Sequence, residues 1–467
     1  MKLIVQWLKQ NNKKIILSII LAVITMFLLP FKSASIIVII ILIAVLYFGE
    51  KLLLSLTIIN FTTSLTEYIG VLRQYLNAIA VIYLIYLFLK RYGLDVKNYP
   101  ILPKEIIYFL ISLFLLLFIT SMCSAYPLIG FISLLTMILF FCICYIFYSL
   151  ISDERDIYLY IYSLCISVLF LAIRIFIDLF NLGVEKFFIK AILESNDELA
   201  GSTGYTGFTI FFITIAFVTA VLFLDQKKRV ISKSILISFL ILNIVTLIFA
   251  NSRAAIVSAF LSVGFLFFNL NKSLLVKISS FFVIGFAIIF FSVPGAEEAI
   301  NTFIRIDSIS QRDVFWNSGI DVIRDYPVLG VGPGAFYKYF YSYSPSFLFS
   351  FFESDIWRYG KPSPHNIFLF YWAENGIFGL IFPILLFIIF FYFAYRTISF
   401  TKQSSYEYYC LSVAITGIGI GILFRAFFEV TGILYYGYIT TDLPFWIVFG
   451  ILVHIYQNFN RKKEQLQ

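Results

Sequence analysis

The sequence predicts an all-α integral membrane protein: a bundle of about 12–14 transmembrane helices with one large external loop. Hydrophobic residues make up 61% of the 467 residues and charged residues only 13%, and the mean hydropathy is +0.95. Apolar runs long enough to cross a hydrocarbon core of about 30 Å recur along the whole chain. The runs are continuous rather than alternating, which indicates helices and not a barrel. This composition excludes a soluble globular protein.

We expect a single polytopic membrane domain over residues 1–467 with no internal repeat. The first apolar run follows four lysines and no small-residue cleavage site comes after it, so we interpret it as a retained span and not a signal peptide. The predicted spans, in chain order, are approximately 14–31, 34–48, 51–64, 69–90, 104–121, 127–150, 157–180, 204–224, 232–250, 253–269, 272–293, 365–395, 405–428 and 434–457.

Basic residues predict the topology, because cytoplasmic loops carry an excess of lysine and arginine. The net charge of +8 fits these loops and needs no nucleic acid. Assigning each basic loop to the cytoplasm gives a consistent alternation with both termini inside, in a cytoplasmic membrane. The basic loops contain Lys90, Arg91, Lys97 and Lys104; Lys227, Lys228, Arg229 and Lys233; Lys272 and Lys277; Arg396 and Lys402; and Arg461, Lys462 and Lys463.

One predicted external loop, residues 295–364, is far longer than the others, and loops of this length are usually functional or disordered. Within it, "SISQRDVFWNSGIDVIRD" predicts an amphipathic helix with Ser310 as N-cap and Val314, Phe315, Ile320 and Ile323 on the apolar face. The following "YPVLGVGPGAF" predicts a tight packed turn. Its glycines Gly330, Gly332 and Gly334 follow no strand, which makes a nucleotide-binding loop the weaker interpretation.

Four arginines lie within or next to predicted spans: Arg73, Arg174, Arg253 and Arg425. An arginine at a helix centre costs about 2.5–3.5 kcal/mol on insertion scales, so each needs a reason. The predicted topology places all four toward the outer leaflet, where a shared anion would be their natural partner.

Each arginine also has a structural explanation. Arg174 and Arg425 have an acid four residues on, Asp178 and Glu429, and each could form a local ion pair. Arg73 could extend its charged end to the interface. Arg253 begins a helix after Asn251 and Ser252, and since helix N-termini favour anions, we favour an anion site there.

His365 is one of two histidines in the chain and lies at the external mouth of a predicted helix, after the Pro-rich break at 362–364. A helix N-terminus disfavours the charged imidazole, and a neutral imidazole accepts a proton. These properties suit a general base, the alternative being a histidine that only caps the helix. His454 is assigned no role.

No metal or cofactor is expected. The five cysteines lie in apolar runs without a CxxC pair and are interpreted as small buried hydrophobes. The sequence also has no Asp-x-Asp, the commonest metal-binding pattern of nucleotide-sugar enzymes.

Three strings in order resemble the family of O-antigen ligase and O-antigen polymerase-like membrane proteins. They are "NSRAA", "RDVFWNSGIDVIRDYPVLGVGPGAF" and "PHNIFLFYWAENGIFGL", and they lie within residues 251–380. The first half of the chain is similar to the family only in being apolar. The resemblance implies a helical bundle similar to other membrane glycosyltransferases that use lipid-linked donors.

The resemblance also implies transfer or polymerisation of glycan from an undecaprenyl diphosphate carrier to a glycan or lipid acceptor, outside the cytoplasmic membrane. Other polysaccharide-assembly membrane proteins are candidate partners. By the resemblance, His365 corresponds to the base and Arg253 to a diphosphate ligand, while Arg312, which begins the second string, is a further substrate-binding candidate. Asn366, Glu374 and the glycines correspond to the structural part of the motif. The segment "ESNDELAGSTGYTGF" departs from the family in lacking an arginine, so Arg73, Arg174 or Arg425 is expected to supply the second phosphate contact.

Two other classes compete with an enzyme. A flippase of lipid-linked glycans would also place arginines in a cavity, but charges at both leaflet depths are expected of it and the external loop would be unused. A scaffolding membrane protein leaves the intramembrane charges unexplained. The motifs do not separate a polymerase from a ligase, because the two differ only in the acceptor.

Overall fold

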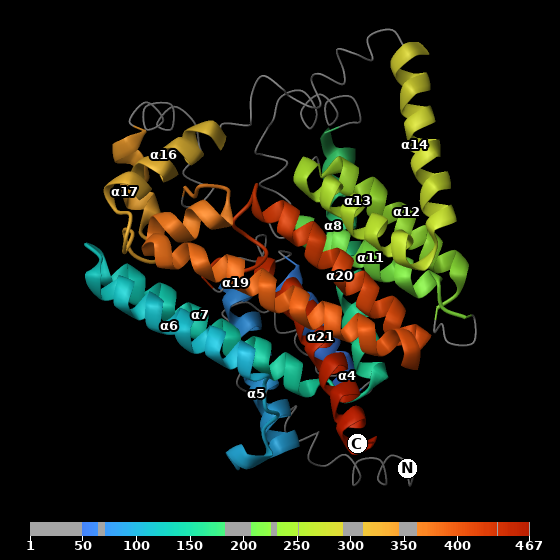
Figure 1. The fold of residues 1–467 in the computed structure, drawn as a ribbon, viewed down its shortest axis with the longest axis horizontal. Helices are drawn as coiled ribbons and strands as arrows, with labels where there is room; N and C mark the ends of the chain where they lie inside the picture. Colours follow the sequence, from blue (N-terminus) through green and yellow to red (C-terminus); the bar gives the residue numbers. More distant parts are fainter. Residues whose placement is uncertain are drawn as a thin grey trace.

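The structure is a computed structural model and describes residues 49–63, 71–182, 207–225, 231–250, 252–292, 312–344, 362–436 and 438–466. Every regular element in these ranges is a helix, so the predicted all-α fold is confirmed. The helices shown in Figure 1 are α4 (Glu50–Thr62), α5 (Val71–Tyr92), α6 (Lys104–Cys123), α7 (Pro127–Leu150), α8 (Glu154–Leu182), α11 (Gly207–Leu222), α12 (Lys233–Phe249), α13 (Arg253–Leu270), α14 (Lys272–Ser292), α16 (Arg312–Asp325), α17 (Phe336–Tyr343), α19 (Ile367–Ser404), α20 (Tyr406–Ala426) and α21 (Ile439–Leu466).

Seven helices within the described residues are long and apolar enough to cross a membrane: α6, α7, α8, α13, α19, α20 and α21. Two further apolar helices, α11 and α12, are shorter. The chain is therefore a multi-pass membrane protein. The predicted spans 14–31 and 34–48 lie outside the described residues, so the total of about 12–14 helices stays a prediction.

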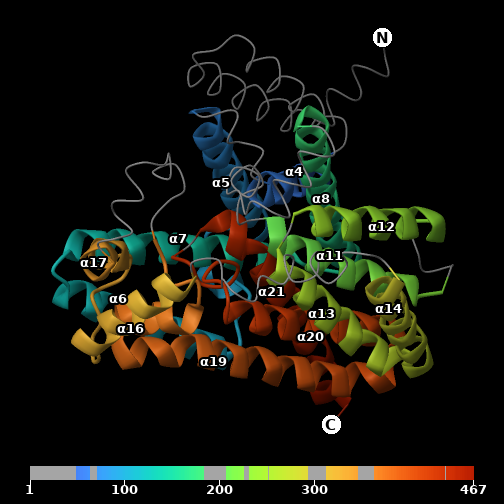
Figure 2. The same ribbon diagram turned by 90° about the horizontal axis from the view of Figure 1, so that it is seen from above.

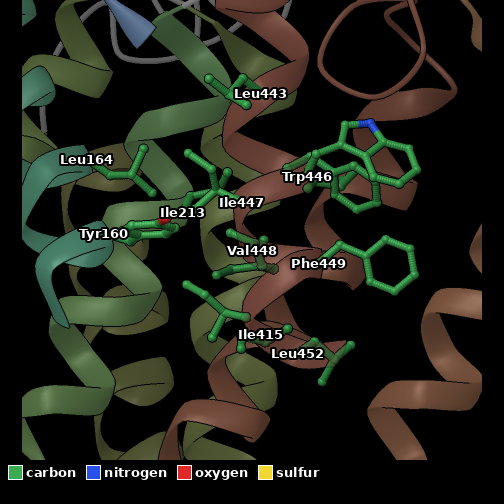
Figure 3. Packing of buried hydrophobic residues seen from close by; sticks show 14 of the residues in the cluster. Tyr160, Leu164, Ile213, Ile415, Leu443, Trp446, Ile447, Val448, Phe449 and Leu452 are labelled. Atoms are coloured by element: carbon green, nitrogen blue, oxygen red, sulfur yellow. The ribbon is translucent and has the colours of Figure 1, made fainter. Parts of the chain in front are cut away.

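The core of the bundle lies where α8, α11, α20 and α21 meet (Figure 3). Tyr160 of α8, Ile213 of α11, Ile415 of α20 and Leu452 of α21 are all fully buried there. The α11 helix is apolar all round, which is the pattern of a helix with no solvent-facing side. Figure 2 shows α11 and α21 in the interior of the bundle, whereas α6 and α7 lie together along one side in both views.

Helices α13 and α20 approach closely because small residues line their interface. The Ser258 hydroxyl donates to the Gly421 carbonyl oxygen at 2.8 Å. A Cβ atom added at Gly417 would lie 2.4 Å from the Ser262 carbonyl oxygen. Ser258 of α13 faces Gly421 of α20, and Ser262, four residues later on α13, faces Gly417, four residues earlier on α20. The two helices are therefore antiparallel. One further step places Ala254, and therefore the start of α13, level with Arg425.

The helix ends predicted to be cytoplasmic gather at one end of the bundle. The Lys51 ammonium lies 2.9 Å from the Asp156 carboxylate, and Arg91 donates to the Leu150 carbonyl oxygen at 2.8 Å. Gln457 of α21 reaches the Ile101 carbonyl oxygen at 3.0 Å. These contacts between helix ends therefore agree with the predicted alternation of the spans across the membrane. Which end faces the cytoplasm stays a prediction, and the basic residues 227–229 lie outside the described residues.

The amphipathic helix predicted in the long loop is present as α16. Val314 and Phe315 pack against its small core, and Ile323 is buried. The prediction was wrong for Ile320, which is 38% exposed, because Val322 occupies the buried side of the turn instead. The predicted cap Ser310 and the loop residues 293–311 and 345–361 lie outside the described residues.

The cysteines differ in part from the prediction. Cys165 and Cys410 are buried, but Cys123 and Cys142 are exposed. Both lie on the long apolar helices α6 and α7, whose outer sides carry other exposed apolar residues such as Leu128 and Leu139. In a membrane such a surface faces lipid, and the apolar runs therefore did not imply burial inside the protein.

Candidate functional site

His365 lies immediately before α19, and its neighbour Asn366 caps that helix. The Asn366 side-chain oxygen accepts hydrogen bonds from the backbone N–H groups of Phe368 and Leu369 at 2.9 and 3.1 Å. His365 itself has φ 46°, a left-handed conformation that is uncommon for residues other than glycine. Its side chain is 21% exposed. The interpretation of His365 as a helix cap is therefore wrong, because Asn366 fills that position.

Helix α16 packs against His365 from the long loop. The Phe315 and His365 rings meet edge to face with centroids 5.1 Å apart. Gly319, one turn further along α16, leaves room for Pro364, whose Cβ would lie 3.4 Å from an added Cβ. The imidazole is therefore held between the start of α19 and one face of α16. Figures 1 and 2 show α16 and α17 near each other at one end of the long helix α19.

Glu429, in the connection 427–438 between α20 and α21, joins His365 to Arg312. Its Oε2 atom lies 3.2 Å from His365 Nδ1, and its Oε1 atom accepts from Arg312 Nη2 at 2.8 Å. The Glu429 side chain is 12% exposed and that of Arg312 is 22% exposed. The three residues come from three separate elements and form one charged cluster at a single end of the bundle.

The carboxylate of Glu429 is held in its ionised form. Burial alone would raise its pKa, but the attraction and hydrogen bond of His365, together with Arg312 and Arg425, outweigh burial and lower the pKa to about 2. An ionised carboxylate can only accept hydrogen bonds. A hydrogen bond between this carboxylate and His365 therefore requires a proton on Nδ1.

Arg425, predicted to bind substrate, lies at the end of α20 and is only 3% exposed. Its guanidinium donates to the carbonyl oxygen and, at 3.2 Å, to the hydroxyl of Thr431. Among the described residues, the ion pairs of Glu429 are with Arg312 and His365, so the local Arg425–Glu429 pair is not formed. This placement favours a role in holding the connection 427–438 over direct contact with a ligand.

Arg253 is the first residue of α13, as predicted, and Ser252 occupies the N-cap position. The antiparallel packing of α13 on α20 brings this helix start to the same end of the bundle as Arg425 and Glu429. Arg253 is partly exposed. The structure therefore brings Arg253, Arg312, Arg425 and His365 to one end.

Two predicted arginines cannot be placed at the site. Arg73 lies in α5 and Arg174 in α8, but both side chains lie outside the described residues, as does the side chain of Asp178. Within the segment 194–208, where the sequence departs from the family pattern, residues 194–206 also lie outside the described residues. Their proposed contacts stay predictions.

Glu374 connects two of the motif strings and is 1% exposed. One carboxylate oxygen accepts from the Gly334 N–H at 2.7 Å and from the Tyr436 hydroxyl, and the other accepts from the Phe336 N–H at 3.0 Å. Phe336 begins α17, where the helix dipole favours a negative charge. Glu374 thus anchors α17 and the turn 327–334, which contains Gly330, Gly332 and Gly334 and is called the glycine turn below.

The glycine turn packs directly on a break in α19. Gly376 has φ 66°, and the broken helix leaves the carbonyl oxygens of Ala373 and Glu374 to accept from Val331 and Gly332 at 3.0 and 2.8 Å. Gly330 also has φ 66°, and a Cβ added there would lie 2.4 Å from the Glu374 backbone. Gly332 and Gly334 have positive φ as well. The three glycines are therefore structural, as a packed turn predicts.

The sequence interpretation missed Glu429 as a partner of His365. In the sequence analysis, Glu429 is identified only as the acid four positions after Arg425. A usable signal was present, since Glu429 is an isolated acid in the apolar string "FFEVTGILYYGY", on the side predicted for His365. A lone acid in such a string needs cationic partners from elsewhere in the fold.

These features define a class: a multi-pass helical membrane protein with a histidine, a carboxylate and several arginines gathered at one end of its bundle. In a comparison with protein families, residues 236–384 match the family described as O-antigen ligase. The matched residues include all three motif strings, as well as Arg253, Arg312 and His365. A comparison with curated proteins gives no match.

The resemblance to the O-antigen ligase family is thereby confirmed for residues 236–384. This match supports a function of the O-antigen ligase or polymerase type in glycan assembly. Glu429 and Arg425 lie outside the matched residues and are brought to the site by α20 and the connection that follows it.

Proposed function

We propose that this protein transfers or polymerises glycan repeat units from an undecaprenyl diphosphate carrier to an acceptor hydroxyl at the outer face of the cytoplasmic membrane. The observation that carries the proposal is the position of His365 within the O-antigen ligase match. It stands at the start of α19 with the capping role already filled by Asn366, and it is partly exposed beside arginine-bearing helix ends.

The reaction needs a proton acceptor and a site for a leaving diphosphate. The acceptor hydroxyl oxygen attacks the anomeric carbon, and its proton passes to Nε2 of His365. The bond between the anomeric carbon and the phosphate oxygen breaks, and the diphosphate leaves with the bonding electron pair. Guanidinium groups stabilise the diphosphate charge through paired hydrogen bonds.

Among the arginines, Arg253 is the favoured diphosphate ligand. It stands at a helix N-terminus, where backbone N–H groups and the helix dipole add to its own charge. Arg312 donates to Glu429 through Nη2, and we assign to a phosphate the other N–H groups of its guanidinium, for which no partner is found among the described residues. Arg425 is proposed to support the site by holding the connection 427–438 in place. Arg73 and Arg174 are further candidates for the second contact with the diphosphate.

The proposal is tested by transfer of a labelled glycan from a carrier-linked donor by the purified protein. Since a positioned base contributes about 10² to 10⁴ in rate, His365→Ala should lower kcat by that order while donor binding is retained. His365→Gln keeps a polar side chain but has no basic nitrogen, so it should be as inactive as His365→Ala. A His365→Gln protein with nearly wild-type kcat would exclude the base assignment.

A further inference from the structure

Glu429 has no role in the reaction as proposed above, although it is the charged residue that joins the site together. It lies 3.2 Å from His365 Nδ1 through one oxygen and 2.8 Å from Arg312 Nη2 through the other. Glu429 belongs to none of the three motif strings and follows His365 by 64 residues. A carboxylate that is 12% exposed in this position requires an explanation beyond chance.

We infer that Glu429 is the positioning residue of the transfer reaction: it fixes the ring of His365 with the proton on Nδ1 and stabilises the imidazolium that forms when Nε2 takes the proton of the acceptor hydroxyl. This inference rests on the proposed role of His365 as base. The carboxylate does not take up the proton itself. The same division of roles between carboxylate and histidine is known from serine-protease triads on unrelated folds.

Arg312 gives Glu429 a fixed position instead of competing with His365 for it. Arg312 binds Oε1, so Oε2 is directed to the imidazole. The positive charge of Arg312 also keeps the Glu429 carboxylate ionised. Glu429 contacts Arg312 and His365 at the same time, one through each oxygen. Glu429 is therefore shared between the loop helix α16 and the start of α19.

The connection that carries Glu429 is anchored at several points. Asp442 of α21 accepts from the Gly432 N–H at 2.7 Å, and Arg425 holds Thr431. The indole N–H of Trp446 donates to the Ile433 carbonyl oxygen at 2.7 Å. A carboxylate on such a support is held in place before substrate arrives, as electrostatic stabilisation of a developing charge requires.

The experiment compares Glu429→Gln and Arg312→Gln in the full-length purified protein with a carrier-linked glycan donor. Glu429→Gln should lower kcat on the order of 10²-fold with a small change in KM, because the amide can also donate to Nδ1 and so stabilise the wrong tautomer. Asp321→Asn is the matched control: it removes one acid from α16, where Asp321 pairs only with the exposed Arg324 of the same helix among the described residues. It should leave kcat unchanged.

The pH profile of kcat/KM separates positioning from a merely structural role. The charged groups described around the His365–Glu429 pair are Arg312 on α16 and Arg425 on α20, both of which act on Glu429. Removing the anion destabilises the imidazolium, so Glu429→Gln should move the acid limb of the profile to lower pH. Removing a cation does the opposite, so Arg312→Gln should move it to higher pH. Equal losses in both variants without opposite shifts would overturn the inference.

A double variant shows whether Glu429 acts through His365. In a His365→Gln background, Glu429→Gln should cause no additional loss in single-turnover transfer, since the residue on which it acts is already gone. An added loss of tenfold or more would contradict the inference. The outcomes also distinguish the two proposals. Active His365→Gln protein refutes the base itself, whereas inactive His365→Gln with fully active Glu429→Gln refutes only the positioning role.

Discussion

His365 and Asn366 divide two roles that a single residue at a helix start would otherwise combine. Asn366 caps α19 through its side-chain oxygen, while His365 adopts φ 46°. A non-glycine residue in such a conformation costs on the order of 1–3 kcal/mol and persists only where its surroundings hold it. Here Phe315 and Glu429 hold the ring from two sides. Strain of this kind is typical of residues placed for chemistry.

At the residue scale, sequence separation explains what could be predicted. His365 and Arg253 could be recognised because Arg253 begins α13 and His365 directly precedes the cap of α19, and helix starts follow from local signals. The partners of Glu429 could not, because Arg312 precedes it by 117 residues and His365 by 64. The nearer Arg425 suggested a local pair, but tertiary packing turned its guanidinium to Thr431.

The proposed diphosphate site makes a prediction for Arg253. A guanidinium binds phosphate through paired hydrogen bonds that an ammonium cannot reproduce. Arg253→Lys should therefore lower kcat/KM for the carrier-linked donor by at least about tenfold, which corresponds to roughly 1.4 kcal/mol of transition-state stabilisation. Arg324→Lys is the control, since Arg324 is 73% exposed and pairs on the surface with Asp321. Equal activity of both variants would remove Arg253 from the site.

At the scale of elements, two motif strings separated in sequence form a single contact. The turn 327–334 packs on the break in α19 at Gly376, and the Ile377 N–H donates to the Pro327 carbonyl oxygen at 2.9 Å. The glycine spacing predicted a turn, but nothing local predicted that its partner would be the "ENGIFG" string. Because the turn and the break satisfy each other's backbone groups, α16 and α17 are fixed relative to His365.

This contact predicts a large effect for Gly376→Ala. The residue has φ 66°, and a Cβ atom there would lie 1.9 Å from the Val328 carbonyl oxygen. The conformational cost alone is on the order of 1 kcal/mol or more, and the turn would also have to move. The midpoint of thermal unfolding in detergent should fall by several degrees, and transfer activity should fall with it.

Gly264→Ala is the matched control for the Gly376 change. Gly264 lies in α13, and no atom would lie within 4 Å of an added Cβ. Alanine at an ordinary helical position is neutral or stabilising by up to about 1 kcal/mol. Comparable unfolding midpoints for the two variants would mean that the turn does not depend on Gly376.

At the scale of the whole molecule, several helix limits were predicted closely, because long apolar runs bounded by polar residues mark spans directly, whereas the predicted 434–457 differs from α21 (Ile439–Leu466) at both ends. The predicted 127–150 matches α7, and 253–269 differs from α13 by one residue. The break in α19 and its extension to Ser404 were not predicted, because Gly376 within an apolar run has the same signal as any helical glycine. The assembly of helix ends into a site depends on packing that no local pattern encodes.

The predicted topology is tested by labelling single cysteines from outside intact cells, in a protein without its five native cysteines. Ser342→Cys lies on exposed α17, and Lys97→Cys lies in the exposed loop between α5 and α6. A membrane-impermeant reagent should label position 342 and leave position 97 unlabelled. The reverse pattern would place the His365 end of the bundle in the cytoplasm.

In the proposed function, the chain transfers glycan at the His365 end of the bundle. A flippase would instead move the intact lipid-linked glycan across the membrane. The most direct measurement follows a labelled glycan on undecaprenyl diphosphate in proteoliposomes that contain only this protein, an acceptor glycan and a chelator. Wild-type protein should form a glycosidic product and release the diphosphate carrier, whereas His365→Gln should form product 10²- to 10⁴-fold more slowly. Translocation of intact donor by both proteins without any new glycosidic bond would contradict the account and identify a flippase.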